Sequence, residues 1–360
     1  MELCSQNLEE LSLWMEQQGE KKFRAKQVFQ AIYHNRISDF SLMTSLPLSF
    51  REKLQKSFLF PSMQLVKIQE EDETKKFLWK LCDGYLVESV LIQSEERRTV
   101  CVSSQVGCKV SCAFCASGKK GWKRNLSSGE ILEQVLLIQK FLSTENESVS
   151  QIVFMGMGEP LENYDNVVKA IRMMISPEGF GLSARRISLS TVGVIEGIHR
   201  LGQENLKINL VLSLHAPNQE IRQKLIPYAY KYLLPDLLEA MDQYFQNTGR
   251  DLTYEYVLFE GVNDSEKDAY QLSRLLQKKH ACLNLIPYNP IEGGSWRRPK
   301  NEIIERFQQI MIEEGIPTTW RYTKGKDISA ACGQLALQDL ASRDLASRDL
   351  ALQDIEKKPC

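Results

Sequence analysis

The chain has 360 residues, of which 43% are hydrophobic and 25% charged, and its formal net charge is −1. This composition is typical of a globular protein with one large and one small domain, and it contains no apolar run long enough to span a membrane. The N-terminus lacks a basic and then apolar signal pattern, so we expect a cytoplasmic protein without membrane association. Because the charges nearly balance, any nucleic-acid binding must depend on local basic clusters.

Residues 1–60 are predicted to form a small helical domain. Apolar side chains recur at helical spacing in two segments of this region, which gives each helix one apolar stripe. The two stripes comprise Phe23, Val28, Phe29, Ile32 and Tyr33, and then Phe50, Leu54 and Phe58. Such a domain either caps the main domain or grips RNA, and its charge pattern does not separate these alternatives.

Residues 61–96 change to the spacing of strands. The pair Asp83-Gly84 separates two apolar runs and predicts a β-hairpin. Glu88 is the only charge in the second run and shares a face with Leu86, Val90 and Ile92. Burial raises the pKa of a carboxyl group toward that of a working base. A charge that protects a sheet edge is an equal alternative.

Residues 97–333 alternate apolar strand candidates with amphipathic helices. The strand candidates lie near 99–103, 151–155, 187–191, 208–214, 254–259, 282–287 and 317–322. This alternation predicts a parallel sheet, either an open α/β sheet or a barrel. Polar side chains gather where the strands end, and those ends share one face of a parallel barrel. The sequence therefore predicts one shared active site at that face.

A cysteine loop follows the first of these strands. Cys108, Cys112 and Cys115 are spaced by four and three residues, and the aromatic Phe114 directly precedes the last of them. Three thiolates at this spacing are suited to an iron–sulfur cluster with one open iron. The alternatives are a zinc site with a distant fourth ligand and unligated thiols.

Three short segments concentrate positive charge, and each is either an RNA contact or a solvated face. They comprise Lys21, Lys22, Arg24 and Lys26; Lys119, Lys120, Lys123 and Arg124; and Arg297, Arg298 and Lys300. Residues 334–360 form a repetitive tail with leucine at five-residue intervals. Because that interval cannot produce one helical stripe, we expect the tail to be dispensable.

Several strings around the cysteine loop resemble one known family. CVSSQVGC ends at the first loop cysteine, and GMGEP, SLHAPN, NLIPYNP and ISAACGQL follow at intervals. Together they resemble the RlmN-type dual-specificity adenine-C2 RNA methyltransferases, members of the radical S-adenosylmethionine superfamily. The resemblance implies a partial (β/α) barrel of about six parallel strands, a small N-terminal helical domain and a β-hairpin. It also implies methylation of one adenine in large-subunit rRNA and in tRNA.

The resemblance assigns cofactors and the residues that bind them. A [4Fe-4S] cluster would be held by the three loop cysteines, and two S-adenosylmethionine molecules would be consumed per turnover. One of these would be cleaved reductively to a 5′-deoxyadenosyl radical. The cofactor-binding residues would be Gly158, Glu159, Ser190, Ser213, Leu214, His215 and Asn289. Structural alternatives exist for some of them: Gly158 and Asn289 could simply build turns, and His215 could be a satisfied polar residue at a strand end.

Three further residues receive catalytic roles from the resemblance. Cys332 would carry a methyl group, and the derived carbon radical would add to the adenine to give a protein–RNA thioether. Glu88 would remove the ring proton. Cys101 would then attack Cys332, form a disulfide and release the product, an exchange open to two accessible thiols. From the sequence alone, without the resemblance, both cysteines have the features of small buried apolar residues.

The family resemblance leaves some alternatives open. A related activity methylates carbon 8 of the same adenine with the same cysteines, and a zinc-stabilised RNA-binding protein without catalysis belongs to a different class. The expected partners are large-subunit rRNA, tRNA and an electron donor such as flavodoxin or ferredoxin. We expect the protein to be a monomer.

Overall fold

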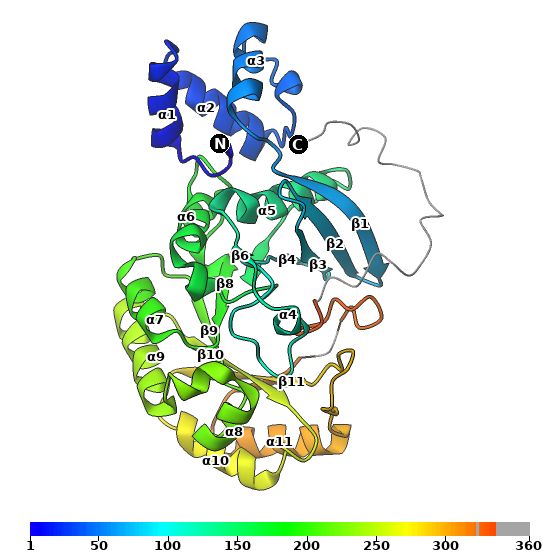
Figure 1. The fold of residues 1–360 in the computed structure, drawn as a ribbon. Helices are drawn as coiled ribbons and strands as arrows, with labels where there is room; N and C mark the ends of the chain where they lie inside the picture. Colours follow the sequence, from blue (N-terminus) through cyan, green and yellow to red (C-terminus); the bar gives the residue numbers. More distant parts are fainter. Residues whose placement is uncertain (322–323, 336–360) are drawn as a thin grey trace.

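The computed structural model describes residues 1–321 and 324–335. The first 59 residues form a helical unit at the top of Figure 1. Its elements are α1 (Leu8–Gln17), α2 (Phe23–Phe29), a π-helical turn (Gln30–His34), a 3₁₀ turn (Phe40–Leu42) and α3 (Leu48–Ser57). The predicted apolar stripes are buried, except that Phe23 is 51% exposed in the first turn of α2. There it faces the Arg24 guanidinium, whose centre lies 5.6 Å from the ring centroid.

One ten-stranded sheet forms the rest of the fold. Its strands, in spatial order, are β1 (Met63–Glu71), β2 (Thr74–Leu81), β3 (Leu86–Gln93), β4 (Arg98–Cys101), β7 (Gln151–Phe154), β8 (Ile187–Thr191), β9 (Asn209–Ser213), β10 (Leu252–Leu258), β11 (Ala281–Pro287) and β12 (Thr318–Trp320). The first four pair antiparallel, and β4 through β12 pair in parallel. Because the order runs from β1 to β12 without closing, the sheet is a partial barrel.

The parallel part contains seven strands among the described residues, one more than the expected six. Each of the seven predicted strand segments coincides with one of them. The strand β1 was not predicted, because its polar residues mask the apolar alternation. It extends the predicted hairpin of β2 and β3, so residues 63–93 continue the barrel sheet.

Helices follow most parallel strands and cover the outside of the curved sheet (Figure 1). They are α5 (Ser128–Ser143), α6 (Tyr164–Ile175), α7 (Ile195–Gln203), α8 (Gln219–Leu225), α9 (Leu234–Thr248), α10 (Glu266–Leu276) and α11 (Asn301–Glu313). A capping box begins α5, where the Glu130 amide donates to Ser127 Oγ over 3.0 Å and the Glu130 carboxylate accepts from the Ser127 amide. Within the described part of the chain, no helix is long and apolar enough to cross a bilayer.

The hairpin turn between β2 and β3 is slightly longer than predicted. The Leu81 amide donates to the Tyr85 carbonyl over 2.8 Å, so the loop spans the three residues 82–84. Gly84 has a φ of +86°, a left-handed conformation that favours glycine. The predicted tail, 334–360, lies outside the described residues except for its first two positions.

Candidate active site

The predicted polar residues come together at the carboxyl ends of the parallel strands. Cys101 ends β4, Ser190 lies near the end of β8, and Ser213 ends β9. The hydroxyl oxygens of Ser190 and Ser213 are 3.2 Å apart. The Asn289 amide, after β11, donates to the Cys332 carbonyl over 3.3 Å. Side chains from five different segments therefore surround one region.

The cysteine loop lies at this end of the barrel and is fixed by tight backbone packing. It begins at Gly107, whose φ is +76° and where a Cβ atom would lie 1.9 Å from the Gly121 carbonyl oxygen. Only glycine can occupy that position, because any side chain would collide with the returning end of the loop. Phe114 packs edge-on against the His215 ring, with centroids 5.1 Å apart. The loop is thereby held over strand β9.

The three loop thiols are free and lie close enough to influence one another. Burial, reinforced by the charge of Cys115, raises the pKa of Cys108 to about 12. Burial also raises the pKa values of Cys112 and Cys115. Thiolates in such surroundings need a strong compensating positive charge, which a bound metal centre supplies.

A buried arginine lies beside this loop. Arg222 is fully buried, and its Nη2 donates to the Val192 carbonyl over 2.7 Å and to the Ser213 carbonyl over 3.2 Å. Its Nε and Nη1 have no hydrogen-bond partner in the described structure. Burial lowers the pKa of Arg222 to about 10, while the nearby Cys112 thiolate acts in the opposite direction. The unpaired N–H donors of this buried guanidinium are suited to interact with an anionic cluster that thiolates hold.

The ligand arrangement differs from a site for one metal ion. Among the described residues, no three His, Cys, Asp or Glu side chains converge closely enough to hold a single ion. Thiolates that bind a four-iron cube each contact a different iron, so they need not converge on one point. An apolar shell that includes Val110, Phe259 and Tyr288 surrounds the cysteines, as suits a cluster that must be shielded from solvent. The residues present therefore fit an iron–sulfur cluster.

The other two predicted cysteines, Cys101 and Cys332, lie close enough that Cys332 affects the pKa of Cys101. Cys101 is buried in β4 and packs with Val90, Met157 and Ala330. Cys332 is solvent-accessible, and both thiols are free. Burial, reinforced by the nearby Cys332, raises the pKa of Cys101 to about 12. Although the Cys332 residue as a whole is exposed, its thiol is desolvated by the surrounding protein atoms, and this desolvation together with the Glu255 carboxylate raises the pKa of Cys332.

Glu88 is 3% exposed and lies on β3, between β2 and β4. It is therefore not on an edge strand, and the edge-protection alternative is wrong. Its carboxylate lies 3.1 Å from the ammonium of the equally buried Lys76. The Lys76 ammonium also donates to the Ser329 carbonyl over 3.4 Å, three residues before Cys332. The Ser103 hydroxyl donates to the Glu88 carbonyl over 2.6 Å.

The loop after β7 contains the predicted residues Gly158 and Glu159. Gly158 has a φ of +107°, and a Cβ atom there would lie 2.7 Å from Ser104 Oγ. The Glu159 carboxylate accepts from the amides of Leu161 and Val192 over 3.0 and 2.9 Å. Burial raises the pKa of Glu159 to about 7. The carboxylate thus anchors its own loop to the end of β8, a positional role that the sequence did not predict.

The remaining predicted residues follow β9. Leu214 is fully buried, and the amides of Leu214 and His215 donate to the Glu255 carbonyl over 3.0 and 3.1 Å. His215 has a φ of +57°, and its Nδ1 accepts from the Val257 amide over 3.1 Å. Burial lowers the pKa of His215 to about 3, so the imidazole is neutral at physiological pH. The Nδ1 atom of this histidine has a structural role, and its other ring atoms can contact a cofactor at the same time.

Sequence reasoning missed a buried carboxylate in the centre of the site. Glu255 on β10 is 6% exposed, and its carboxylate accepts from Ser190 Oγ over 3.4 Å and from Arg321 Nη1 over 3.0 Å. Burial raises the pKa of Glu255, and Arg321 opposes this. A lone carboxylate in an apolar strand was the signal that identified Glu88, and it was also present in TYEYVLF.

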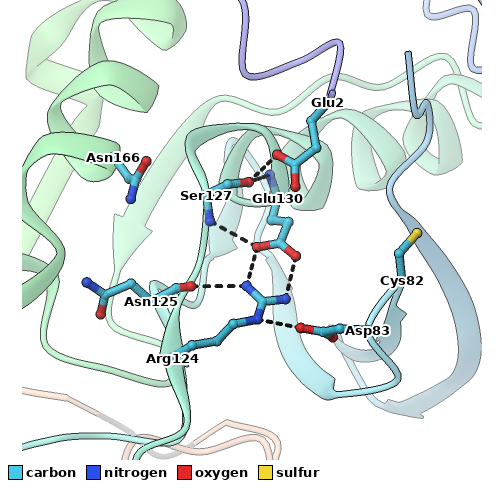
Figure 2. A pocket seen from close by; sticks show the side chains of 8 residues that line it. All are labelled: Glu2, Cys82, Asp83, Arg124, Asn125, Ser127, Glu130 and Asn166. Carbon is cyan, nitrogen blue, oxygen red and sulfur yellow. Dashed lines mark hydrogen bonds and ion pairs between the residues drawn. The ribbon is translucent and has the colours of Figure 1, made fainter. Parts of the chain in front are cut away.

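The second basic cluster is only partly available to a ligand. Figure 2 shows the Arg124 guanidinium enclosed by carboxylates at a surface cavity of about 360 Å³. It donates to both oxygens of Glu130 over 2.7 and 2.8 Å and also to Asp83. Glu2 accepts from Ser127 in the same network, which joins the N-terminal helical unit to the start of α5. Arg124 therefore links the hairpin turn to the start of α5, and two carboxylates already compensate its charge.

Comparison with known proteins identifies the family. Residues 1–59 match the family model of the ribosomal RNA large subunit methyltransferase N-terminal domain, and residues 102–273 match the radical SAM superfamily. A curated relative from Protochlamydia amoebophila, named as a dual-specificity RNA methyltransferase RlmN, is 54% identical over 91% of this chain and 92% of its own length. The chain belongs to the RlmN family of radical SAM RNA methyltransferases.

Further comparisons extend the assignment to the whole fold. An RlmN relative from Geobacillus kaustophilus is 44% identical over 94% of this chain and 93% of its own length. The crystal structure of a radical SAM methyltransferase from Sphaerobacter thermophilus is 41% identical and superimposes with a TM-score of 0.92, over 94% of this chain and all of that one. The chain is thus an enzyme of the family whose cofactors are a [4Fe-4S] cluster and S-adenosylmethionine.

Proposed function

We propose that this enzyme methylates carbon 2 of a specific adenine in large-subunit rRNA and in tRNA. One observation carries the proposal beyond the family name: the accessible Cys332 lies beside the buried Cys101, and Lys76 links the Glu88 carboxylate to the Cys332 loop. A methyl carrier, a resolving thiol and a proton acceptor are therefore available within one opening. An adenine ring carbon is not nucleophilic, so simple methyl displacement would not suffice and radical chemistry is required.

The site residues divide into those that hold the cofactors and those that act on the RNA. Cys108, Cys112 and Cys115 hold the cluster, while Gly158, Glu159, Ser190, Ser213, Leu214, His215 and Asn289 surround S-adenosylmethionine. When bound, these groups supply the methyl group and a radical that abstracts hydrogen. Arg222 places its positive charge beside Cys112 and so favours the anionic form of the cluster ligands.

The protein's own side chains carry the remaining steps. The Cys332 sulfur carries the methyl-derived carbon and becomes joined to the adenine by a thioether. The Glu88 carboxylate accepts the ring proton, and Lys76 stabilises the charged carboxylate beforehand. The Cys101 thiolate then attacks the Cys332 sulfur, and the disulfide between the two cysteines forms. The bond between that sulfur and the methyl-derived carbon breaks, and the carbon keeps the electron pair and takes up a proton to become the methyl group of the released adenine, while the unpaired electron of the radical adduct returns to the one-electron donor.

The electron donor, the oligomeric state and the cellular location follow from the same proposal. Reductive chemistry needs a one-electron donor of low potential, for which flavodoxin or ferredoxin is suited. We propose that the enzyme acts as a monomer in the cytoplasm, where rRNA and tRNA are present and thiols are kept reduced.

The proposal is tested by mass spectrometry of adenosines from rRNA and tRNA treated with the anaerobic holoenzyme. We expect 2-methyladenosine in both RNAs, and its formation should require an electron donor. Formation of 8-methyladenosine would assign the enzyme to the related carbon-8 activity. Stoichiometric zinc without iron in the anaerobic protein would exclude the radical mechanism.

A further inference from the structure

A second cavity, of about 340 Å³, lies beside the cysteine loop. The hairpin turn before β3, both ends of the cysteine loop and the segment after β7 contribute to its wall. Its lining includes Tyr85, Val106, Ser117, Lys120, Lys123 and Met157. None of the roles assigned above uses this cavity, although its volume lies in the range of ligand pockets.

The cavity combines an apolar interior with a positively charged, aromatic rim. Val106 and Met157 are each 2% exposed and form part of its interior. Tyr85 is 43% exposed, and Lys120 and Lys123 are also exposed. An apolar slot beside an exposed aromatic ring accommodates a planar base, and the adjacent ammonium groups complement a phosphate.

The rim is held in place by the backbone. The Lys123 amide donates to the Val106 carbonyl over 2.9 Å, which fixes Lys123 to the cavity wall. The Tyr85 amide donates to the Asp83 carboxylate over 3.1 Å, and Asp83 is in turn bound by Arg124. The tyrosine and the lysine are therefore presented from two anchored segments, and a ligand that contacts both is bound without reorganising the loop.

Met157 separates this cavity from the reacting cysteines. Its side chain packs in one apolar cluster with Cys101 and Ala330. Cys101, Cys332 and Glu88 do not line the cavity in the described structure. A base inside the cavity therefore cannot be the one that reacts, but it lies one side chain away from Cys101.

We propose that this cavity binds an unpaired nucleotide that neighbours the target adenosine in the substrate RNA. The base stacks on Tyr85 and contacts Val106 and Met157, while its phosphate is bound by Lys123 and Lys120. This inference rests on the proposed RNA substrate and deepens it. It adds the requirement that the target lie in a single-stranded stretch with a stackable neighbour.

The test uses the anaerobic holoenzyme without S-adenosylmethionine, so that binding is measured without turnover. Dissociation constants of fluorescent RNA hairpins are measured by anisotropy for the wild type, Tyr85→Ala and Tyr85→Phe. Tyr270→Ala, at a partly exposed tyrosine on α10, is the matched control. Loss of one base–aromatic stack should weaken binding about tenfold in Tyr85→Ala, whereas Tyr85→Phe and Tyr270→Ala should bind like the wild type.

Abasic RNA identifies the nucleotide that occupies the cavity. Removing one base at each position flanking the target should reproduce the loss at a single position. The Tyr85→Ala variant should bind this abasic RNA as tightly as it binds intact RNA. The reason is that the missing base and the missing tyrosine ring remove the same contact. Lys123→Gln should reduce the slope of log Kd against log salt by about one.

Two results would overturn the inference. The first is a Tyr85→Ala affinity within twofold of the wild type. The second is that the loss of affinity caused by removing a base simply adds to the loss caused by Tyr85→Ala at every flanking position. Failure of the proposed function gives a different result. In that case the wild type forms no 2-methyladenosine, whatever the binding constants. At saturating RNA, Tyr85→Ala should still form 2-methyladenosine, because the tyrosine contributes to binding only.

Discussion

The Glu88 carboxylate and the Lys76 ammonium lie 3.1 Å apart, and both side chains are almost completely buried. Buried charges require such pairing, since removal of one partner leaves the other uncompensated. The pair connects the predicted proton acceptor to the loop of Cys332, because Lys76 also contacts the Ser329 carbonyl. This lysine is therefore the positioning residue for Glu88.

Lys76→Met should destabilise the protein by about 3 kcal/mol or more, because it removes the ammonium that compensates the buried Glu88 charge. The double variant Lys76→Met/Glu88→Gln should recover much of that loss, since neither remaining side chain is charged. Denaturant unfolding of both proteins checks this. If the double variant is no more stable than the single one, the two side chains do not interact as described.

Glu255 and Arg321 should have opposite effects on Cys332. Glu255 raises the pKa of this thiol, whereas Arg321 lowers it. Glu255→Gln should therefore increase the rate at which iodoacetamide alkylates Cys332, and Arg321→Gln should decrease it, because the thiolate is the reactive form. Peptide mass spectrometry at one fixed pH measures both rates. Rate changes of the same sign in the two variants would contradict this electrostatic account.

Arg222 should affect the redox properties of the cluster more than its assembly. A buried positive charge stabilises the more negative, reduced state, so Arg222→Gln should lower the reduction potential by about 60 mV or more. Arg222→Lys retains the charge and is the matched control. Potentiometric titration followed by electron paramagnetic resonance gives the potential, with iron content measured alongside. An unchanged potential at full iron content would show that Arg222 has only a packing role.

His215 should make the folded state sensitive to acid. Its pKa in the folded protein is about 3, below its ordinary value of 6.5. The unfolded chain therefore binds a proton that the folded chain does not, and stability falls as the pH decreases from about 6.5 toward 3. The variant His215→Asn removes the titrating imidazole, and asparagine tolerates the positive φ at this position.

Glu159 shifts in the opposite direction, since its raised pKa lowers stability as the pH increases from 4.5 to about 7. The difference in the free energy of unfolding between the wild type and His215→Asn isolates the contribution of the histidine. This difference should change by about 1.4 kcal/mol per pH unit between the two pKa values of His215. Chemical denaturation at several pH values measures this difference, and a flat difference would contradict a buried, neutral imidazole.

The sequence predicted most of the fold because its signals are local. All seven parallel strands coincide with apolar runs, and the helical stripes of residues 1–60 are buried apart from Phe23. The strand β1 escaped prediction because its exposed polar residues hide the alternation. A local pattern also predicted the cysteine loop, because all three thiols lie within eight residues.

The partners of the predicted residues could not be read in the same way. Lys76, Arg222, Glu255 and Arg321 reach the site through strand pairing and crossover connections, which no local spacing records. Arg124 shows the limit of charge runs: its neighbours in sequence are basic, but its contacts in space are the carboxylates of Glu130 and Asp83. A run of like charges therefore says less about contacts in space than an apolar run says about a strand.

The central claim is that Cys332 carries the carbon to adenine and Cys101 acts only at release. The most direct test is denaturing gel electrophoresis of Cys101→Ala after reaction with RNA, with Cys332→Ala as control. We expect Cys101→Ala to accumulate a slow, reductant-resistant protein–RNA band attached at Cys332, because thiols reduce disulfides but do not cleave thioethers. Cys332→Ala should give no band. Normal turnover by Cys101→Ala, or inactivity without an adduct, would contradict the proposed order of events.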